Sequence, residues 1–118
     1  MIQEDKDYCD LKTVLKLKSL GMNVYTSFKG IDVIKNISIY EVLKWLREEK
    51  NLYICPSVIT DYQDDWQYSD IVYWSFIVVN IESGDSIYRE YEHKDEKRFE
   101  SYELAAIAGI EYVIDNLI

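Results

Sequence analysis

The sequence predicts an α+β fold in which a three-stranded antiparallel sheet has two helices packed on one face, preceded by an N-terminal helix. Residues 38–50 and 101–117 show the apolar spacing of helices, whereas the chain between them alternates or is rich in β-branched and aromatic residues, as strands are. The length of 118 residues suits one domain, 1–118. We divide it into an N-terminal helix and connection, 1–37, and a helix–strand–strand–strand–helix core, 38–118.

The N-terminal region predicts one helix and an ambiguous connection. Over residues 10–20 apolar side chains recur at helical spacing, and Gly21 is a typical C-terminal stop. Residues 22–36 give mixed signals, and 23–28 is compatible with either a short strand or an ordered loop around Gly30. The apolar positions of this helix are Leu11, Val14, Leu15 and Leu17.

The clearest local signal is the start of a helix at Ser38. Ser38 and Glu41 have the spacing of a capping box. Ile37 and Val42 stand at the two positions of a hydrophobic staple. We expect this helix to end near Asn51, with an apolar stripe formed by Ile39, Val42, Leu43 and Leu46.

Three strands are expected to follow, at residues 52–60, 71–81 and 86–93. The second is nearly free of charge and rich in β-branched and aromatic residues, which indicates the central strand. Pro56 in the first strand favours a sheet edge or a bulge. Residues 61–70 are expected to form a polar loop, and Gly84 a turn with positive φ.

A final helix is expected after Ser101, which would cap it. The small residues Ala105, Ala106, Ala108 and Gly109 would let this helix lie close to the sheet or to the preceding helix. Its predicted apolar face consists of Leu104, Ile107, Ala108, Ile110, Val113, Ile114 and Leu117.

Charge is distributed unevenly along the chain. Residues 1–50 carry nine Lys or Arg and eight Asp or Glu, whereas residues 51–118 carry four and fourteen, which gives net charges of +1 and −10. An acidic field repels phosphate backbones, so binding to DNA or RNA is disfavoured. The acidity has two interpretations, since it either confers solubility alone or attracts a positively charged partner.

No pattern in the sequence indicates catalysis, a metal or a cofactor. The single histidine, His93, lies in a mixed-charge run that suits a solvated surface. The four carboxylates of the loop 61–70 lack the order of an EF-hand, and the four glycines are too scattered to hold a phosphate. We therefore expect no enzymatic activity, no metal and no cofactor.

The two cysteines and the first residues of the sequence indicate the cellular compartment in which the protein is expected. Cys9 and Cys55 have unlike surroundings and no CxxC partner, so we expect free thiols in a reducing environment. The acidic segment 1–7 lacks the order of a secretion signal, and no apolar run approaches the ~18 residues that span a bilayer. These features predict a cytoplasmic protein without membrane association.

Aromatic side chains are abundant, with eleven tyrosines and three tryptophans. In the acidic half many lie among carboxylates and without Lys or Arg, which resembles a protein-binding face more than a nucleic-acid platform. Ordinary cross-strand packing is the alternative interpretation. The residues that we predict to contact a partner are Tyr62, Asp64, Asp65, Trp66, Tyr68, Tyr88 and Tyr91.

The order helix, three strands, helix resembles the double-stranded-RNA-binding fold. In that family lysines at the start of the last helix grip phosphate, whereas residues 99–105 here read Phe-Glu-Ser-Tyr-Glu-Leu-Ala. The resemblance therefore implies the topology and not the RNA activity. A looser resemblance relates residues 101–105 to the helix start of HicB-type antitoxins.

Two further blocks, residues 38–49 and 99–111, resemble a family of short uncharacterised proteins from gut anaerobic bacteria and their phages or mobile elements. The likeness spans residues 38–118 and, more faintly, the helix at 10–21. Because that family has no established activity, the resemblance implies the fold and a mobile-element origin and transfers no functional residue.

Our leading hypothesis is a non-enzymatic accessory protein that binds an unknown protein partner through an acidic, aromatic sheet face or the loop 61–70. The alternative is a nucleic-acid mimic or antitoxin-like regulator of a basic protein. Exposed apolar area on the N-terminal helix could support a homodimer. Direct nucleic-acid binding would need a basic patch, for which the candidates are Lys12, Lys16, Lys18, Lys29 and Lys35.

Overall fold

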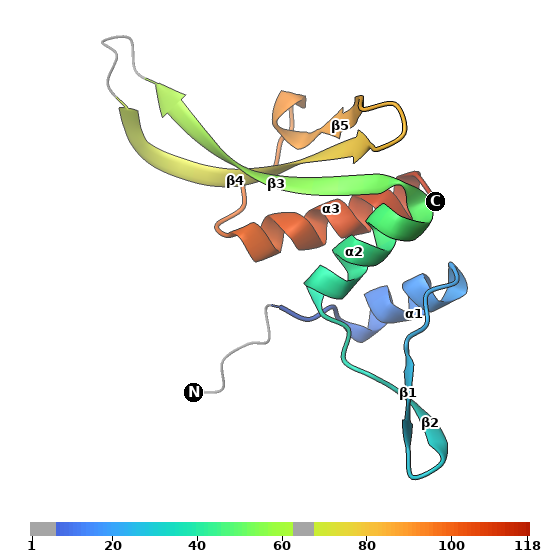
Figure 1. The fold of residues 1–118 in the computed structure, drawn as a ribbon. Helices are drawn as coiled ribbons and strands as arrows, with labels where there is room; N and C mark the ends of the chain where they lie inside the picture. Colours follow the sequence, from blue (N-terminus) through green and yellow to red (C-terminus); the bar gives the residue numbers. More distant parts are fainter. Residues whose placement is uncertain (1–6, 63–67) are drawn as a thin grey trace, which may run out of the picture.

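The computed structural model describes the backbone of residues 7–62 and 68–118 and the side chains of residues 7–59 and 73–118. In chain order (Figure 1) the elements are α1 Leu11–Ser19, β1 Tyr25–Phe28, β2 Ile31–Ile34, α2 Ile39–Lys50, β3 Leu52–Tyr62, β4 Tyr68–Asn80, β5 Ser86–Arg89, the 3₁₀ helix η1 Glu90–Glu92 and α3 Tyr102–Asn116. The strands form two separate antiparallel sheets, β1–β2 and β3–β4–β5. This arrangement confirms the predicted α+β class.

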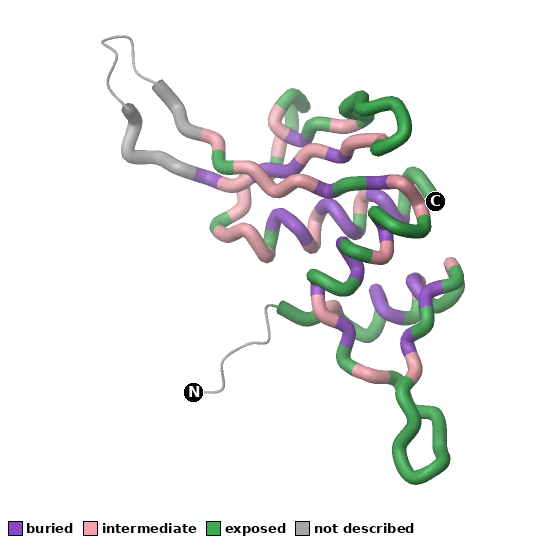
Figure 2. The backbone as a smooth tube through the Cα atoms, viewed as in Figure 1, coloured by how far each residue is buried: buried purple, intermediate pink, exposed green. Residues whose placement is uncertain are grey.

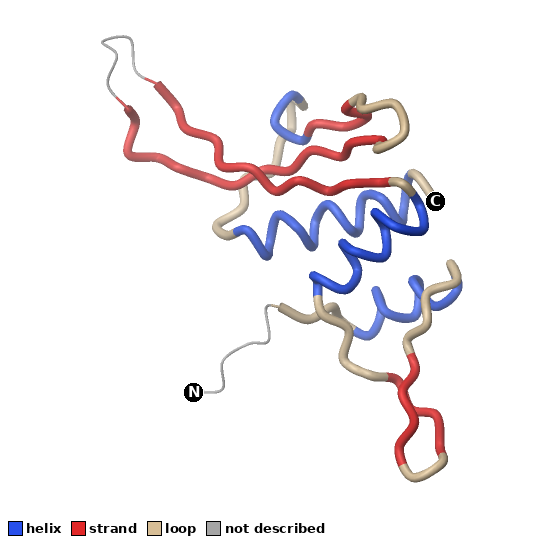
Figure 3. Tube along the Cα trace, in the orientation of Figure 1, coloured by secondary structure: helices blue, strands red, loops and turns tan. Residues whose placement is uncertain are grey.

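The elements are arranged in layers. Helices α2 and α3 cover the same side of the β3–β4–β5 sheet, and α1 lies beyond them, where it contacts α3 (Figure 1). The β3–β4 ribbon extends past the end of α3, and the β1–β2 hairpin projects from the body (Figure 3). The radius of gyration, 16.6 Å, therefore exceeds the value of about 13.5 Å expected for a compact chain of this length.

Helix α2 begins and ends where the sequence predicts. The Oγ of Ser38 accepts a hydrogen bond from the backbone N of Glu41 at 3.1 Å. Of the two capping-box hydrogen bonds, the structure shows the one accepted by Ser38. The side chain of Glu41 instead forms an ion pair with Lys35 at 3.4 Å. Asn51 ends the helix in the left-handed region, with φ 55°. All four residues of the predicted apolar stripe are buried.

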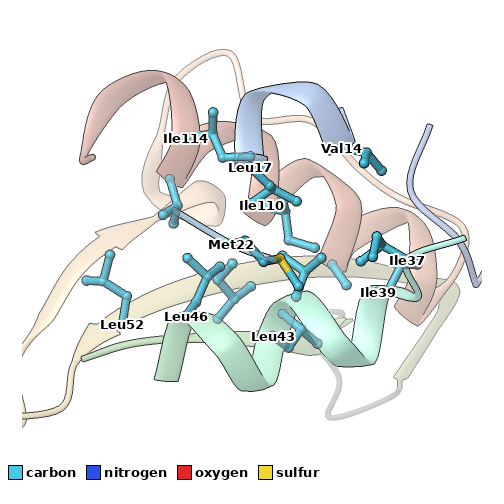
Figure 4. Close-up of a cluster of buried hydrophobic side chains, with 14 of the residues drawn as sticks. Val14, Leu17, Met22, Ile37, Ile39, Leu43, Leu46, Leu52, Ile110 and Ile114 are labelled. Atoms are coloured by element: carbon cyan, nitrogen blue, oxygen red, sulfur yellow. The ribbon is translucent and has the colours of Figure 1, made fainter. Parts of the chain in front are cut away.

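One hydrophobic core joins the N-terminal helix to the rest of the domain (Figure 4). Leu17 from α1 and Ile39 and Leu46 from α2 are fully buried against side chains of the sheet and α3. Because α1 contributes to the same core, this helix packs onto the body, whereas the β1–β2 hairpin projects from it. The largest fully buried aliphatic side chains are Leu17, Ile37, Ile39, Leu46, Ile54 and Ile110.

Helix α3 packs on the sheet through its small residues. Ser101 caps the helix by accepting a hydrogen bond from Leu104 N at 3.1 Å, as predicted. Leu104 and Leu117, which we expected on the apolar face, are 38% and 36% exposed. Because Gly109 has no side chain, the helix approaches the sheet along the stripe that contains it. The buried residues of α3 are Ala105, Ala106, Gly109, Ile110, Val113 and Ile114.

The long β3–β4 ribbon corrects the prediction of a ten-residue loop at 61–70. β3 continues to Tyr62 and β4 begins at Tyr68, and these two residues are paired. Thr60 pairs with Val72, and after a register shift the strands pair again at Tyr62 and Tyr68. β3 lies at an edge of the sheet, as Pro56 indicates, and β4 lies at its centre.

The third strand is shorter than the predicted segment 86–93. β5 pairs with β4 only from Ser86 to Arg89, with a register shift, and the chain then turns into η1. It returns to the edge of β4 at Phe99, which exchanges two backbone hydrogen bonds with Trp74, of 2.8 and 3.0 Å. The segment between Arg89 and Phe99 contributes residues to the wall of the site described below.

The ambiguous segment after α1 is a β-hairpin. Phe28 pairs with Ile31 across a two-residue turn in which Lys29 and Gly30 have φ of 52° and 79°. Most hairpin residues are exposed (Figure 2).

The expected apolar stripe of α1 is only half buried. Leu11 and Leu15 are 61% and 44% exposed, whereas Val14 and Leu17 are buried together with Thr13. The buried residues of α1, Thr13, Val14 and Leu17, share one helix face, and Leu11 and Leu15 lie outside it.

We predict that Gly109→Ala destabilises the fold. An added Cβ would lie 2.6 Å from Ile54 Cγ2 and 3.2 Å from the Phe76 ring. Ile54 is branched at Cβ and fully buried, so its methyl group has little freedom to move. We expect a net loss of about 1–2 kcal/mol in the free energy of unfolding, because overpacking exceeds the gain in helix propensity. Urea unfolding measures it, and Glu111→Ala in the same helix is the control; an unchanged or higher stability for Gly109→Ala would contradict the packing described.

Both cysteines are free thiols in the structure. Cys9 lies in a segment that is bonded to the start of α2, since its backbone N donates to Ile37 O at 2.9 Å. Burial, followed by the nearby carboxylates of Asp10, Glu111 and Glu41, raises the pKa of the Cys9 thiol to about 11. The thiol is therefore protonated at neutral pH and is a weak nucleophile.

We predict slow, strongly pH-dependent alkylation of Cys9. In a Cys55→Ser variant, the rate with iodoacetamide should rise about tenfold per pH unit between pH 7 and 10, because only the thiolate reacts. The same variant in urea should show a midpoint near ~8.5, the value of an unperturbed thiol. A folded-state midpoint close to that of the unfolded chain would show that Cys9 is not shielded.

Candidate functional site

A cavity of about 310 Å³ lies between α3 and the β4–β5 side of the sheet. Four of its lining residues are aromatic and three carry carboxylates, and we call it the aromatic pocket. Its volume is at the lower end of the range of ligand sites. The aromatic pocket is lined by Phe76, Tyr88, Glu90, Lys97, Phe99, Ala108, Glu111, Tyr112 and Asp115.

The periodicity of α3 builds one wall of the aromatic pocket. Ala108, Glu111, Tyr112 and Asp115 are spaced at i, i+3, i+4 and i+7, so they share one helix face. Ala108 is small and leaves room between the larger neighbours. The outermost residue, Asp115, forms an ion pair with Lys16 of α1, with 3.0 Å between Oδ1 and Nζ.

The opposite wall consists of aromatic side chains from the sheet. Phe76 on β4 and Tyr88 on β5 have ring centroids 5.6 Å apart, and Phe99 lies 6.2 Å from Phe76. Tyr88 also stacks on Tyr112 of α3, with centroids 3.7 Å apart and planes inclined by 21°. A second ring, His93, stacks on Tyr88 at 4.6 Å. These contacts hold the rings of both walls in fixed orientations.

The carboxylate of Glu90 is the buried polar group of the aromatic pocket. Glu90 is only 8% exposed, although it belongs to η1 at the sheet edge. The Tyr88 hydroxyl donates to one carboxylate oxygen, and the backbone N of Lys97 donates to the other at 3.2 Å. Both donors are neutral, and no ion pair of Glu90 is found among the described residues. The pocket therefore contains a buried negative group without a cationic partner.

The Tyr88 hydroxyl interacts with the Glu90 carboxylate, and this contact affects its pKa. Burial and the hydrogen bond to Glu90 raise the pKa of the Tyr88 hydroxyl well above its ordinary value of about 10. The hydroxyl therefore stays protonated and continues to donate to Glu90 over the neutral and mildly alkaline range.

Two of the residues predicted to contact a partner, Tyr62 and Tyr68, lie at the distant end of the β3–β4 ribbon. Asp64, Asp65 and Trp66 are outside the described residues. Tyr62 and Tyr68 are the paired residues at the ends of β3 and β4, and their side chains also lie outside the described part. No contact of these side chains therefore enters the site.

The other two predicted residues lie near the aromatic pocket. Tyr88 lines it directly, and Tyr91 is half-buried in η1. Tyr88 pairs with Val78, ten residues along β4 from Tyr68, which corresponds to about 34 Å of extended strand. The structure thus separates Tyr88 and Tyr91 from Tyr62 and Tyr68 instead of bringing these four residues together.

Sequence reasoning missed the helical wall and the buried carboxylate. The spacing of Ala108 and Tyr112 indicates a shared helix face, but nothing local shows that this face meets β5. Glu90 was expected to be solvated in a strand, and its burial results from the turn of the chain into η1. The alternative interpretation of the tyrosines as cross-strand packing describes Tyr88 in part, since its ring packs on Phe76.

The described part of the chain contains neither a metal-binding cluster nor a membrane-spanning helix. Within residues 7–62 and 68–118, no group of three or more His, Cys, Asp or Glu side chains is arranged to hold a metal ion. In the same residues no helix combines the length and apolar character needed to cross a membrane.

Comparisons with models of protein families, with curated proteins and with solved structures found no match to this chain. The geometry of the aromatic pocket therefore supplies the argument about function.

We predict that Tyr88→Phe destabilises the protein by about 1.5–3 kcal/mol at pH 7, because it removes a hydrogen bond to a buried carboxylate. Since folding raises the Tyr88 pKa, the wild-type advantage is complete below pH ~10 and is lost as the pH rises further. Urea unfolding at pH 7, 9 and 10.5 measures both effects, with Tyr91→Phe as the control. Equal stability of Tyr88→Phe and wild type at pH 7 would contradict the Tyr88–Glu90 contact.

Proposed function

We propose that this protein is a non-enzymatic accessory protein that binds a basic protein partner through the acidic surface around the aromatic pocket. The observation that supports this is the charge distribution over the described side chains. Residues 73–118 carry ten Asp or Glu and four Lys or Arg, a net charge of −6, whereas residues 7–59 have a net charge of +2. Charge complementarity of this kind directs association toward positively charged surfaces.

The chemistry of the shifted groups also favours binding over catalysis. The two groups with the largest pKa changes, the Cys9 thiol and the Tyr88 hydroxyl, are both shifted toward the protonated form. A thiol or a phenol that acts as a nucleophile or base at neutral pH is activated by a lowered pKa instead. His93 is exposed and stacks on Tyr88, as a packing residue does.

The same acidic surface supports one alternative, a nucleic-acid mimic or antitoxin-like regulator that occupies the phosphate-binding groove of a basic protein. In this case DNA or RNA would compete with the protein for its partner. The resemblance of residues 38–118 to short proteins of gut anaerobes and their phages or mobile elements is compatible with either role, and a mobile-element origin stays a prediction.

We predict that partner binding depends on salt and on the C-terminal carboxylates. The tagged protein serves as bait in host lysate at 50 and 500 mM NaCl, and the captured protein is purified and titrated. Neutralising three exposed acidic residues, as Glu92→Gln, Asp95→Asn and Glu100→Gln, should weaken binding about tenfold at low salt, because exposed charges act through long-range attraction.

The matched control neutralises three exposed acidic residues of the N-terminal half, as Asp32→Asn, Glu48→Gln and Glu49→Gln. This variant should bind within about twofold of wild type, because its charge change is equal and its location differs. Equal weakening of both variants, or binding that does not respond to salt, would overturn the proposal. Displacement of the partner by duplex DNA or RNA would favour the mimic.

A further inference from the structure

We propose that the aromatic pocket binds one organic cation, the ammonium or guanidinium end of a lysine or arginine side chain of the partner. This inference rests on the proposed function, because it names the chemical group by which the acidic surface would recognise a basic protein. The inference goes beyond the proposed function because it assigns recognition of the basic side chain to the aromatic pocket and not to the negative potential of the whole acidic surface.

The size of the aromatic pocket suits one long side chain. Its volume of about 310 Å³ is small for an extended peptide and sufficient for an alkyl chain with a charged end. Ala108 and the Phe76 ring provide apolar lining for the alkyl part, as long basic side chains require when they bury their stems.

The aromatic lining provides attraction for a cation. The faces of phenylalanine and tyrosine rings carry negative electrostatic potential, and a cation within about 6 Å of a ring centroid is stabilised by it. This chain makes such contacts elsewhere, since Arg98 lies 4.3 Å from the ring of Tyr73 and Lys18 lies 5.0 Å from that of Tyr25. Four rings line the aromatic pocket, and since Tyr88 and Tyr112 stack on each other, the cation would lie beside this pair and not between its rings.

The carboxylates select a positive charge over a neutral group of the same shape. Glu90 is buried and bonded only to neutral donors in the described residues, and Glu111 lines the same space from α3. A buried carboxylate gains most from a cation that approaches it away from water. At the outer end, Asp115 forms an exposed ion pair with the ammonium group of Lys16.

Lys97 is the cation of the chain that could compete for the aromatic pocket. It lines the space, yet its side chain makes no ion pair or ring contact among the described residues. Its charge therefore opposes an incoming cation, while Glu111 favours one. Both side chains are exposed, so each is replaceable without disturbing the core. They give two variants with opposite expected effects.

The test uses four small probes and the full-length protein, followed by ¹H–¹⁵N NMR. N-acetyl-arginine methylamide and N-acetyl-lysine methylamide are the cations, and the citrulline and norleucine analogues are the neutral controls. The cations should shift the amide signals of Tyr88, Lys97 and Tyr112 with roughly millimolar affinity, as expected for a single side chain. The neutral analogues should leave these signals unchanged at the same concentration.

The variants test the assignment to this cavity. Glu111→Gln should weaken binding of the arginine probe about two- to fivefold, and Lys97→Gln should strengthen it about twofold, since each removes one partly screened charge. Glu49→Gln, which removes an exposed charge of α2 outside the lining, should bind as wild type. Equal shifts from arginine and citrulline probes, or identical affinities for Glu111→Gln and Lys97→Gln, would overturn the proposal.

The outcomes also separate this inference from the proposed function. Salt-dependent partner capture by a protein whose aromatic pocket binds none of the cations would overturn the pocket assignment alone. Cation binding without capture of a basic protein would overturn the proposed partner and assign the pocket to a free organic cation. Weaker partner binding by Glu111→Gln, with Glu49→Gln unaffected, is the result that we expect.

Discussion

The close contact of α3 with the sheet at Gly109 is the constraint on which the rest of the structure depends. A hydrogen in place of a side chain lets the helix backbone approach Ile54 and Phe76 more closely than any other residue would permit. With α3 fixed at this distance, the helix also contacts α2 and α1. The N-terminal helix therefore packs partly on a surface that the last helix provides.

The aromatic pocket forms where this close packing stops. Ala108 and Tyr112 lie beside the Gly109 contact on α3, facing the short strand β5. At Arg89 the chain leaves the sheet, and it returns only at Phe99. The space left between the helix and the interrupted strand is closed by rings and carboxylates instead of aliphatic side chains. The cavity is thus a consequence of a strand that ends early next to a closely packed helix.

Local features of this fold were predictable and non-local ones were not. Ser38 and Ser101 cap their helices through contacts three residues away, so short motifs suffice to locate them. The exposure of Leu11 on α1 depends on how far the body extends beneath the helix, which periodicity does not reveal. The same holds for the site: Tyr88 was recognised as a candidate from its composition, but its stacking on Tyr112 requires the fold to be known.

The buried carboxylate of Glu90 affects both the stability of the fold and the proposed binding of a cation. Glu90 loses most of its contact with water and accepts hydrogen bonds from two neutral donors, the Tyr88 hydroxyl and the Lys97 amide. A cation would stabilise its carboxylate more than these neutral donors do. A bound cation would supply the missing charge and stabilise the folded state in proportion to its concentration. An aliphatic residue at position 90 would avoid the cost of burying a carboxylate and remove the charge selectivity. If the proposed cation binds there, Glu90 supplies the charge selectivity at a cost to the stability of the isolated domain.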